Sequence, residues 1–350
     1  MTLNIIQIVK RFGPVGGMEE YAYRLTQELF RLGFRITVLC EINYSNDYKG
    51  INVIELGVHT KPHWLSHYRF SNKVNRWLSE NHCDERIIHS HERESSHHIS
   101  TFHTTPFNLG KPWILKFLSI RNYFYEKLEK RELFSPSVQA IVPVSNILGD
   151  LIRQKHPSCS NRIEVAIYPG VDLVLPDIQF KREVPKEAET IGFMGKEWKR
   201  KGLLKVINIW RELKKSRPNL KLKIAGVKAE ACSHLLGKTE SNLNILGFVK
   251  DRELFYHSID LLIHPAKLEA FGMVISEALA MGTPVLCSSE CGASEVIKEG
   301  TGVSIPYNSE ISVWTEKASE LLESNYLVDY RRNWSTVAKE YKKIYSGILT

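Results

Sequence analysis

The chain has 350 residues, of which 43% are hydrophobic and 25% are charged, and its formal net charge is +8. This is the composition of a globular protein, and the length suits two domains better than one hydrophobic core. No apolar run reaches the roughly 18 residues that a membrane-spanning helix needs, and the N-terminus enters a predicted strand instead of a signal peptide. No zinc-finger or RNA-binding signature accompanies the basic charge, so we expect phosphorylated substrates or an anionic membrane surface as partners, and no nucleic acid.

The first half begins with the pattern of a βαβ unit. Residues 4–9 and 35–41 are predicted to be strands, and 19–32 carries apolar residues at helical spacing. The glycine-rich loop 13–17 lies between the first strand and the helix, but it lacks the G-x-G-x-x-G spacing of a dinucleotide-binding loop. Further strands are predicted at 86–90, 99–104 and 139–144.

Histidines are dense between His89 and His103, from the first to the second of these later strands. His89 and His91 alternate on a predicted strand, yet no carboxylate or cysteine spacing completes a metal site. The six cysteines contain no C-x-x-C pair, and reduced thiols are typical of the cytosol. We therefore expect a cytoplasmic protein without a bound metal.

Residues 111–131 interleave aromatic and aliphatic side chains with Lys116, Arg121 and Lys127. This pattern suits an amphipathic segment that lies on an anionic membrane surface. It equally suits an ordinary helix whose aromatic side chains enter the core. Both interpretations remain open at this point.

The second half restarts the alternation of strands and helices. The turn at 168–172 and the charged stretch 181–189 mark the linker, and a helix is predicted over 202–215. Strands are predicted at 190–194, 220–225, 243–248, 260–264, 284–288 and 302–305. We therefore expect an α/β protein whose domains are 1–170 and 171–333.

Residues 264–285 hold the most informative pattern of the chain, two glutamates with seven residues between them beside a predicted helix start. The strand 260–264 ends at Pro265, and 273–281 is predicted to be a helix. The first N–H groups of a helix have no internal partner and favour an anion such as phosphate. The donors here would be Phe271, Gly272, Met273 and Val274. Glu269 and Glu277 would then bind hydroxyl groups on either side of that anion, a ribose and a hexose; the alternative is that both are ordinary exposed acids.

This stretch resembles the E-x7-E motif of the retaining GT4 glycosyltransferases, in the context H-P…E-x-F-G…E-A…G-x-P-V. The resemblance implies the GT-B fold, in which two Rossmann-like domains face each other across a central cleft. The first domain, 1–170, would bind the acceptor, and 171–333 would bind the nucleotide sugar. The terminal helix, 334–350, would cross back to pack on the first domain.

The resemblance also implies roles for individual residues. Glu277 would hold the nucleotide ribose, Glu269 would contact sugar hydroxyls, and the backbone near Val249 would read the base. Gly16 and Gly17 match the G-G-x-E loop of the family, whose backbone amides approach the donor diphosphate.

Two further segments match family motifs. Ser-Thr-Phe-His-Thr at 100–104 resembles the T-F-H segment whose histidine contacts the donor sugar, which makes His103 a candidate catalytic residue. Arg200-Lys201-Gly202 resembles the diphosphate-binding segment of lipopolysaccharide core glucosyltransferases. Many members have G-R-x5-K-G instead, and this chain has Lys196 at the arginine position with one residue fewer before Lys201.

The implied function is retaining transfer of a hexose, UDP-linked by preference, to a hydroxyl of a cell-envelope glycan or glycolipid such as lipopolysaccharide core. The resemblance implies no metal and no cofactor besides the donor, and the family's similar basic aromatic region favours a peripheral position on the inner face of the membrane through 111–131. The alternatives are a mannosyltransferase that uses GDP-mannose, a GT-B sugar-nucleotide epimerase and a non-catalytic nucleotide-sugar-binding subunit.

Overall fold

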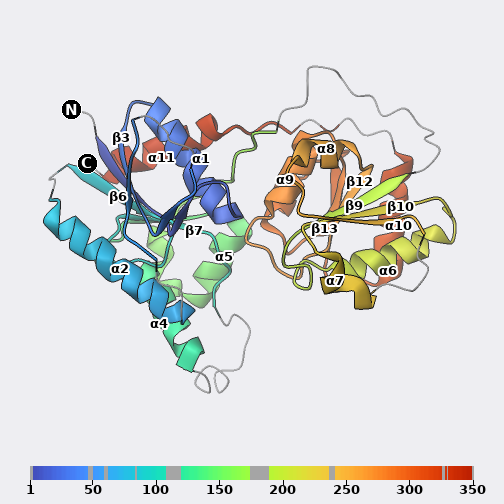
Figure 1. Ribbon diagram of the computed structural model, residues 1–350, viewed down its shortest axis with the longest axis horizontal. Coiled ribbons are helices and arrows are strands. Elements are labelled where there is room, and N and C mark those ends of the chain that lie inside the picture. Colours follow the sequence, from blue (N-terminus) through green and yellow to red (C-terminus); the bar gives the residue numbers. More distant parts are fainter. Residues whose placement is uncertain are drawn as a thin grey trace. The chain divides into compact units, whose positions relative to one another are not determined.

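The computed structural model describes residues 3–45, 50–58, 62–82, 85–107, 120–173, 189–235, 241–324, 328 and 330–348. It divides into two compact units (Figure 1). Unit 1 comprises Met1–Gly170 with Asn333–Thr350, and unit 2 comprises Val171–Arg332. Each unit contains a six-stranded parallel sheet.

The sheet of unit 1 has the strand order β5-β3-β1-β6-β7-β8. Its strands are β1 (Asn4–Ile8), β3 (Arg35–Cys40), β5 (Asn52–Glu55), β6 (Arg86–Ser90), β7 (Ile99–Phe102) and β8 (Ala140–Pro143). The helices are α1 (Gly17–Arg31), α2 (His63–Glu80), α4 (Ile120–Phe134), α5 (Asn146–Lys155) and α11 (Trp334–Ile348). A short second sheet pairs β2 (Arg11–Phe12) with β4 (Ile42–Asn43). The central strands are almost wholly buried, because helices cover both faces of a parallel sheet.

The sheet of unit 2 has the order β11-β10-β9-β12-β13-β14. Its strands are β9 (Thr190–Met194), β10 (Lys221–Ala225), β11 (Leu243–Gly247), β12 (Leu261–His264), β13 (Val285–Ser288) and β14 (Gly302–Ile305). The helices are α6 (Leu203–Lys214), α7 (Ala229–Cys232), α8 (Arg252–His257), α9 (Met273–Ala280) and α10 (Ile311–Glu323). Trp210 of α6 and Trp314 of α10 are fully buried in its core.

Both sheets reverse their strand order at one point, between β1 and β6 in unit 1 and between β9 and β12 in unit 2. In open α/β sheets, ligands bind beyond the carboxyl ends of the strands at such a switch point. The glycine loop follows β1, and the loop with Glu269 follows β12. Each unit therefore carries predicted site residues at the edge where this fold places a ligand.

The last helix, α11, belongs to unit 1 and lies beside α1 (Figure 1). Tyr341 and Tyr345 are fully buried, and the hydroxyl of Tyr341 lies 3.1 Å from that of Tyr21 on α1. Gly170 passes so close to α11 that an added Cβ would lie 2.7 Å from the backbone nitrogen of Trp334. The end of the chain thus completes the core of the unit in which the chain began.

The predicted α/β class with two Rossmann-like halves is confirmed by these sheets. The strands predicted at 86–90, 190–194 and 302–305 have the predicted bounds. Of the segment 111–131, residues 111–119 lie outside the described part, and the remainder forms most of α4.

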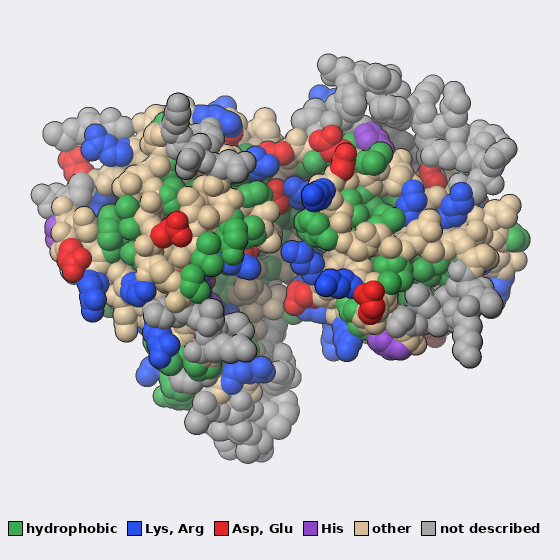
Figure 2. Space-filling view, viewed as in Figure 1, with side chains coloured by type: hydrophobic (Ala, Val, Ile, Leu, Met, Phe, Trp, Pro, Cys, Tyr) green, Lys and Arg blue, Asp and Glu red, His purple; other side chains and the backbone are tan. Residues whose placement is uncertain are grey.

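Among the described residues, none of the helices combines the length and the hydropathy needed to cross a bilayer. On the face seen in Figure 2, basic and acidic side chains are interspersed over the surface. The described residues include no cluster of three or more His, Cys, Asp or Glu side chains that could hold a metal ion.

Candidate functional site

The loop between β12 and α9 presents unpaired backbone donors at a helix start. Gly272 precedes the helix with φ 95°, a left-handed conformation that favours glycine. The N–H of Ala293 donates to the carbonyl of Phe271 at 2.7 Å and fixes the loop from the other side. Within the described residues, the N–H groups of Gly272, Met273 and Val274 have no hydrogen-bond acceptor. These donors lie where the sequence predicts an anion site at the start of α9, and the binding of an anion there stays a prediction.

Glu269 lies in this loop and is paired with two cations. Nη1 of Arg200 donates to Oε2 of Glu269 at 2.7 Å, and Nζ of Lys201 lies 3.3 Å from Oε1. Burial raises the pKa of the Glu269 carboxyl, but Lys201 and Arg200 outweigh this effect and hold the pKa below its ordinary value. Glu269 is therefore an anion at neutral pH, and the structure brings together three of the predicted site residues.

Two glycines position this cationic pair. An added Cβ at Gly195 would collide with the side chain of Lys201, so the absence of a side chain makes room for the lysine. Gly202 has φ 82°, and a Cβ there would collide with the backbone carbonyl of Pro265. The loop after β9 and the end of β12 thus pack against each other through Gly202, which places Arg200 and Lys201 beside Glu269.

Glu277 lies one turn into α9 and is held by different partners. It is 4% exposed, accepts a hydrogen bond from Nη1 of Arg252 at 2.6 Å, and accepts another from the hydroxyl of Tyr256 at 2.7 Å. Both partners lie on the short helix α8. The sequence analysis identified Glu277 but neither partner, because a six-residue helix leaves too little periodicity to detect.

The predicted base-reading segment lies at the end of β11. Val249 is partly exposed, and the neighbouring ring of Phe248 is 72% exposed. The ammonium group of Lys196 lies 5.7 Å from the centre of that ring. Lys196, which occupies the position of the family's arginine, thus lies near an exposed aromatic surface.

In unit 1, Gly16 and Gly17 lie at the N-terminus of α1. Gly16 is the N-cap residue, and the structure describes no hydrogen bond from the N–H of Gly17 or of Met18. The Glu19 carboxylate lies close to Gly16 and accepts a hydrogen bond from Nε of Arg11 at 2.8 Å. The glycine loop therefore leads into the N-terminus of α1, where the carboxylate of Glu19 is paired with Arg11.

His103 follows β7 and is the partly exposed end of a buried polar network. Its Nε2 lies 2.9 Å from Nδ1 of His91, and the ring of Tyr21 packs against it with 5.0 Å between ring centres. Burial lowers the pKa of His103 to about 3, so the ring is neutral at physiological pH. His91 is buried and connects His103 to the interior of the unit.

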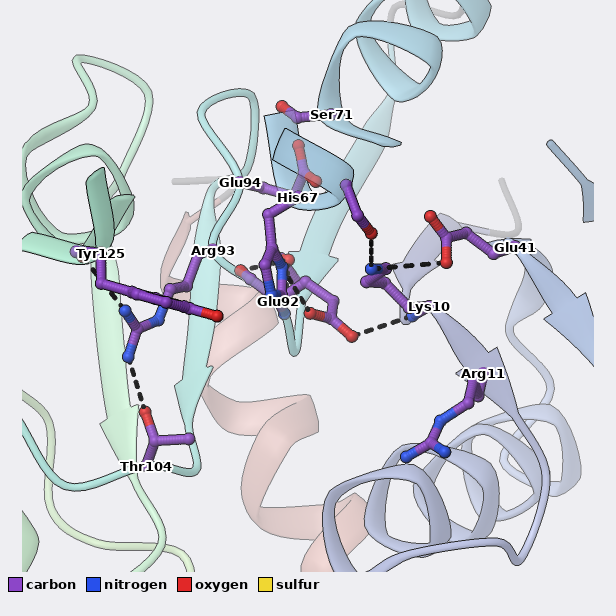
Figure 3. A network of polar contacts seen from close by, with 12 residues as sticks. Lys10, Arg11, Glu41, His67, Ser71, Glu92, Arg93, Glu94, Thr104 and Tyr125 are labelled. Atoms are coloured by element: carbon purple, nitrogen blue, oxygen red, sulfur yellow. Dashed lines mark hydrogen bonds and ion pairs between the residues drawn. The ribbon is translucent and has the colours of Figure 1, made fainter. Parts of the chain in front are cut away.

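The structure adds a cluster of buried charged groups that the sequence analysis did not identify (Figure 3). The backbone N–H of Lys10 donates to Oε1 of Glu92 at 3.0 Å, and Nζ of Lys10 lies 3.4 Å from Glu41. Burial raises the pKa values of Glu92 and Glu94 to about 7. The signal was the acidic pair directly after a buried strand, where the carboxyl edge of the sheet lies.

Arg93 lies between these two acids in sequence but contacts other residues. In Figure 3 it points toward Tyr125 and Thr104, donating to the carbonyl of Tyr125 at 3.1 Å and to the Thr104 hydroxyl at 3.3 Å. It thereby links the loop after β6 to α4 and to the residue that follows His103.

Comparison with known families agrees with these two halves. The model of Glycosyltransferase Family 4 matches residues 15–175, and that of glycosyl transferases group 1 matches residues 176–341. The chain belongs to the GT4-type glycosyltransferases. The two matches meet at residues 175 and 176, close to the boundary between the units at Gly170 and Val171, and the second match of this glycosyltransferase extends into α11, which belongs to unit 1.

Individual relatives are distant. An uncharacterized glycosyltransferase of Methanocaldococcus jannaschii is 25% identical and aligns over 98% of both chains. A D-inositol 3-phosphate glycosyltransferase of Corynebacterium urealyticum is 22% identical over 97% of this chain and 92% of its own length. The lipopolysaccharide glucosyltransferase WaaG of Escherichia coli is 29% identical, but over 45% of this chain and 46% of its own.

Solved structures show the same GT-B architecture. The crystal structure of WaaG superposes with a TM-score of 0.79 at 19% identity and covers 98% of this chain and 99% of its own. The Anabaena protein HepE in complex with UDP-glucose has a TM-score of 0.68 at 16% identity and covers 99% of this chain and 100% of its own. At these identities the likeness establishes the fold of the glycosyltransferase, and its substrates require a separate argument.

Proposed function

We propose that this glycosyltransferase moves a hexose, with retention of configuration, from a UDP-sugar to a hydroxyl of a cell-envelope glycan such as lipopolysaccharide core. The observation that carries the proposal is the group formed by Arg200, Lys201, Glu269 and the unpaired N–H groups at the start of α9. It combines cations and backbone donors for a diphosphate with a carboxylate for sugar hydroxyls. The similarity to the lipopolysaccharide glucosyltransferase WaaG supports the acceptor class.

Arg200 and Lys201 supply the charge that the leaving group needs. When the bond to the sugar breaks, negative charge grows on the β-phosphate, and preorganised cations stabilise this charge more in the transition state than in the bound donor. The N–H groups at the start of α9 add donors that need no reorganisation. The diphosphate would therefore share the cations that Glu269 holds in place.

Glu277 is suited to bind the two ribose hydroxyls. Its carboxylate is oriented by Arg252 and Tyr256, and a charged acceptor forms stronger hydrogen bonds to hydroxyls than a neutral acceptor does. Phe248 provides an exposed aromatic face next to the predicted base-reading residue Val249. We assign the ribose to Glu277 and the base to the segment at 248–249.

The proposed reaction needs no protein nucleophile. The acceptor hydroxyl attacks the anomeric carbon from the face that the diphosphate leaves, and its proton passes to the leaving phosphate. Glu269 is paired with two cations, which lowers the nucleophilicity of its carboxylate and favours this route over a covalent intermediate. Incubation with a 2-deoxy-2-fluoro donor followed by intact-mass spectrometry tests the point, since a glycosylated protein would contradict the front-face route.

We assign acceptor binding to unit 1. Its carboxyl edge carries the polar cluster of Lys10, Glu92 and Glu94. Hydroxyl groups of a glycan are suitable partners for such a set of hydrogen-bond acceptors and donors. A membrane-bound glycolipid would be reached through 111–131, and cosedimentation with anionic liposomes at low salt tests this; a protein that stays in the supernatant would contradict it.

A screen of UDP-, GDP- and ADP-sugars by thermal shift tests the donor directly. We expect the largest rise in Tm with a UDP-hexose, because a ligand that binds only the folded state stabilises it. A response to GDP-mannose alone would contradict the proposed UDP-sugar donor.

Two further measurements test the mechanism. The anomeric configuration of the product, determined by NMR, tests retention. Unchanged turnover in EDTA tests the proposal that no metal takes part.

A further inference from the structure

A continuous series of hydrogen bonds connects His103 with α11. The helix is far from His103 in the sequence but belongs to the same unit. Starting at the surface, Nε2 of His103 lies 2.9 Å from Nδ1 of His91, and Nε2 of His91 lies 2.9 Å from Oε1 of Gln7. Nε2 of Gln7 lies 3.3 Å from Nδ1 of His89, whose Nε2 lies 2.7 Å from the hydroxyl of Thr101. One end of this series of hydrogen bonds is a group that can only accept. That end determines which partner is the donor in each hydrogen bond of the series.

The end that can only accept is the carbonyl oxygen of Ile167. The hydroxyl of Tyr21 donates its proton to this carbonyl at 3.1 Å. Tyr341 must then be the donor in its 3.1 Å contact with Tyr21, because the proton of Tyr21 is already used. For the same reason, Thr101 donates to Tyr341 across 2.6 Å.

This direction continues through the buried histidines. Since Thr101 donates to Tyr341, it must accept from Nε2–H of His89. Burial and the neighbouring histidine rings lower the pKa of His89 well below its ordinary value, so the ring is neutral and Nδ1 is an acceptor. Nδ1 accordingly faces two donors, the amide of Gln7 and the hydroxyl of Tyr345, at 3.3 Å and 2.8 Å.

The remaining two steps end at His103. The amide of Gln7 turns its oxygen to His91, so Nε2 of His91 carries the proton. Burial lowers the pKa of His91 well below its ordinary value, and the neutral ring uses Nδ1 as an acceptor for the Nε2–H of His103. Nδ1 of His103 is thus left with its lone pair, and none of the described residues donates to it.

The reversed set of protons is less favourable for a specific reason. If every bond from Thr101 to His103 ran the other way, Tyr341 would donate to Thr101, and the single proton of Tyr21 would face two acceptors, the carbonyl of Ile167 and the oxygen of Tyr341, each at 3.1 Å. One of these two buried acceptors would be left without its hydrogen bond. Tyr341 is therefore the link that transmits the direction.

We propose that Tyr341 of α11 is a positioning residue that fixes the tautomer of His103, so that Nδ1 of His103 accepts a hydrogen bond from a substrate hydroxyl. The tautomer follows from the network alone, whereas the clause about the substrate rests on the proposed function. The donor sugar is then recognised by one hydroxyl group, which donates a hydrogen bond to Nδ1 of His103. A sugar that lacks that hydroxyl, or carries fluorine there, would be discriminated against, because fluorine cannot donate.

NMR of the ring nitrogens tests the tautomer without any substrate. The chain has 13 histidines, so the signals of His103 in ¹⁵N-histidine-labelled protein are assigned by their loss in His103→Gln. In the wild type we expect long-range ¹H–¹⁵N correlations of a neutral ring with a protonated Nε2 and an unprotonated Nδ1. A ring protonated at Nδ1, or at both nitrogens, would overturn the proposal.

Two variants on the same helix separate the direction of the network from the packing of α11. Tyr341→Phe removes the link to Tyr21, and we expect the His103 signals to shift toward a mixture of the two tautomers. Tyr345→Phe removes a hydroxyl of the same type, which contacts His89 and Gln7 but does not link Thr101 to Tyr21, and we expect unchanged His103 signals. Unchanged signals in both variants, or equal shifts in both, would refute the role of Tyr341.

Turnover tests the clause about the substrate. With the preferred donor, Tyr341→Phe should lower kcat/KM about fivefold, as for the loss of one neutral hydrogen bond. Across a set of monodeoxy donor sugars, the wild type should disfavour the one that lacks the recognised hydroxyl, and Tyr341→Phe should lose that discrimination. If the NMR result holds and the discrimination is absent, the tautomer stands and the assignment of His103 to the donor sugar fails.

Discussion

At the scale of single residues, Glu269 and Glu277 share one motif but differ in their surroundings. Glu269 is paired with Arg200, whose side chain is 41% exposed, and with Lys201. Glu277 is enclosed, with one arginine and one tyrosine as donors. The exposed Arg200 is available to an incoming diphosphate and Lys201 is only 14% exposed, while the enclosed carboxylate of Glu277 is oriented before any ligand arrives.

Replacing Glu277 with alanine should weaken nucleotide binding. A hydrogen bond to a charged group contributes about 1.5 to 3 kcal/mol, which corresponds to a rise in Kd of roughly 10- to 100-fold. Isothermal titration calorimetry with UDP measures the Kd of the variant and of the wild type. Glu253→Ala, which removes an exposed glutamate from α8, is the matched control and should leave Kd unchanged; equal affinities in both variants would contradict the ribose assignment.

Lys201 should matter more for turnover than for binding, because its charge is needed most when the diphosphate leaves. We expect Lys201→Met to lower kcat by about 100-fold, as seen when one preorganised donor to a developing anion is removed. Lys267→Met removes an exposed lysine from the loop that carries Glu269 and should have little effect. A variant with raised KM and normal kcat would assign Lys201 to ground-state binding.

Glu92 should make the stability of the protein depend on pH. Burial raises its pKa from 4.5 to about 7, so its contribution to stability is full below pH about 4.5 and is lost as the pH rises through 7. Glu92→Gln remains neutral and keeps an acceptor for the N–H of Lys10. At pH 8.5 it should therefore be more stable than the wild type, by at most about 3 kcal/mol at 1.36 kcal/mol per pKa unit.

Urea unfolding at pH 5 and pH 8.5 checks this sign. The difference between Glu92→Gln and the wild type should shrink at pH 5, where the native carboxyl is protonated. Glu80→Gln, at an exposed position on α2, should show no such dependence. If the variant were less stable than the wild type at pH 8.5, the ionised carboxylate of Glu92 would stabilise the native state, and the prediction would be wrong.

At the scale of elements, the sequence predicted the parts that depend on local pattern. The strand β12, the glycine at the start of α9 and the stop after it follow from apolar runs, Pro265 and Gly272, and all lie where expected. The partners of the site residues were not predicted, because they are contacts between distant segments. His89 and Tyr345, for example, are 256 positions apart in the chain, and Arg252 lies on a helix of six residues.

The turn at Gly202 gives a prediction about the element that carries the cations. Gly202→Ala combines a left-handed backbone with a collision against the carbonyl of Pro265, so we expect a loss of several kcal/mol of stability. Gly247→Ala is the matched control, because Gly247 has φ 64° and nothing within 4 Å of an added Cβ. It should cost only about 1 kcal/mol in urea unfolding; equal costs would mean that the loop yields to the methyl group.

At the scale of the whole molecule, the chain passes from one unit to the other twice. The two passages are side by side, since the N–H of Val171 donates to the carbonyl of Arg332 at 2.7 Å. Gly170 and Trp334, on the unit 1 side of the passages, are in direct contact. Unit 2 is therefore an insertion between α11 and the rest of unit 1.

Removing residues 333–350 should consequently damage unit 1 and spare unit 2. The deletion uncovers Tyr21 and His89, which are fully buried in the complete chain. Limited proteolysis with mass spectrometry should show rapid cleavage in 1–170 and a resistant fragment within 171–332. Equal resistance of both units would contradict the view that α11 is part of the first core.

The return of α11 also has a consequence for synthesis of the protein on the ribosome. The polypeptide emerges from its N-terminus, so the sheet of unit 1 is made first but remains without its last helix until the whole of unit 2 has followed. Unit 2 is contiguous in the chain and can fold as soon as it has emerged. The part that is translated first is thus the part that is finished last. Until α11 arrives, the side chains that pack against it, Tyr21 and His89 among them, are exposed and are candidates for protection by chaperones.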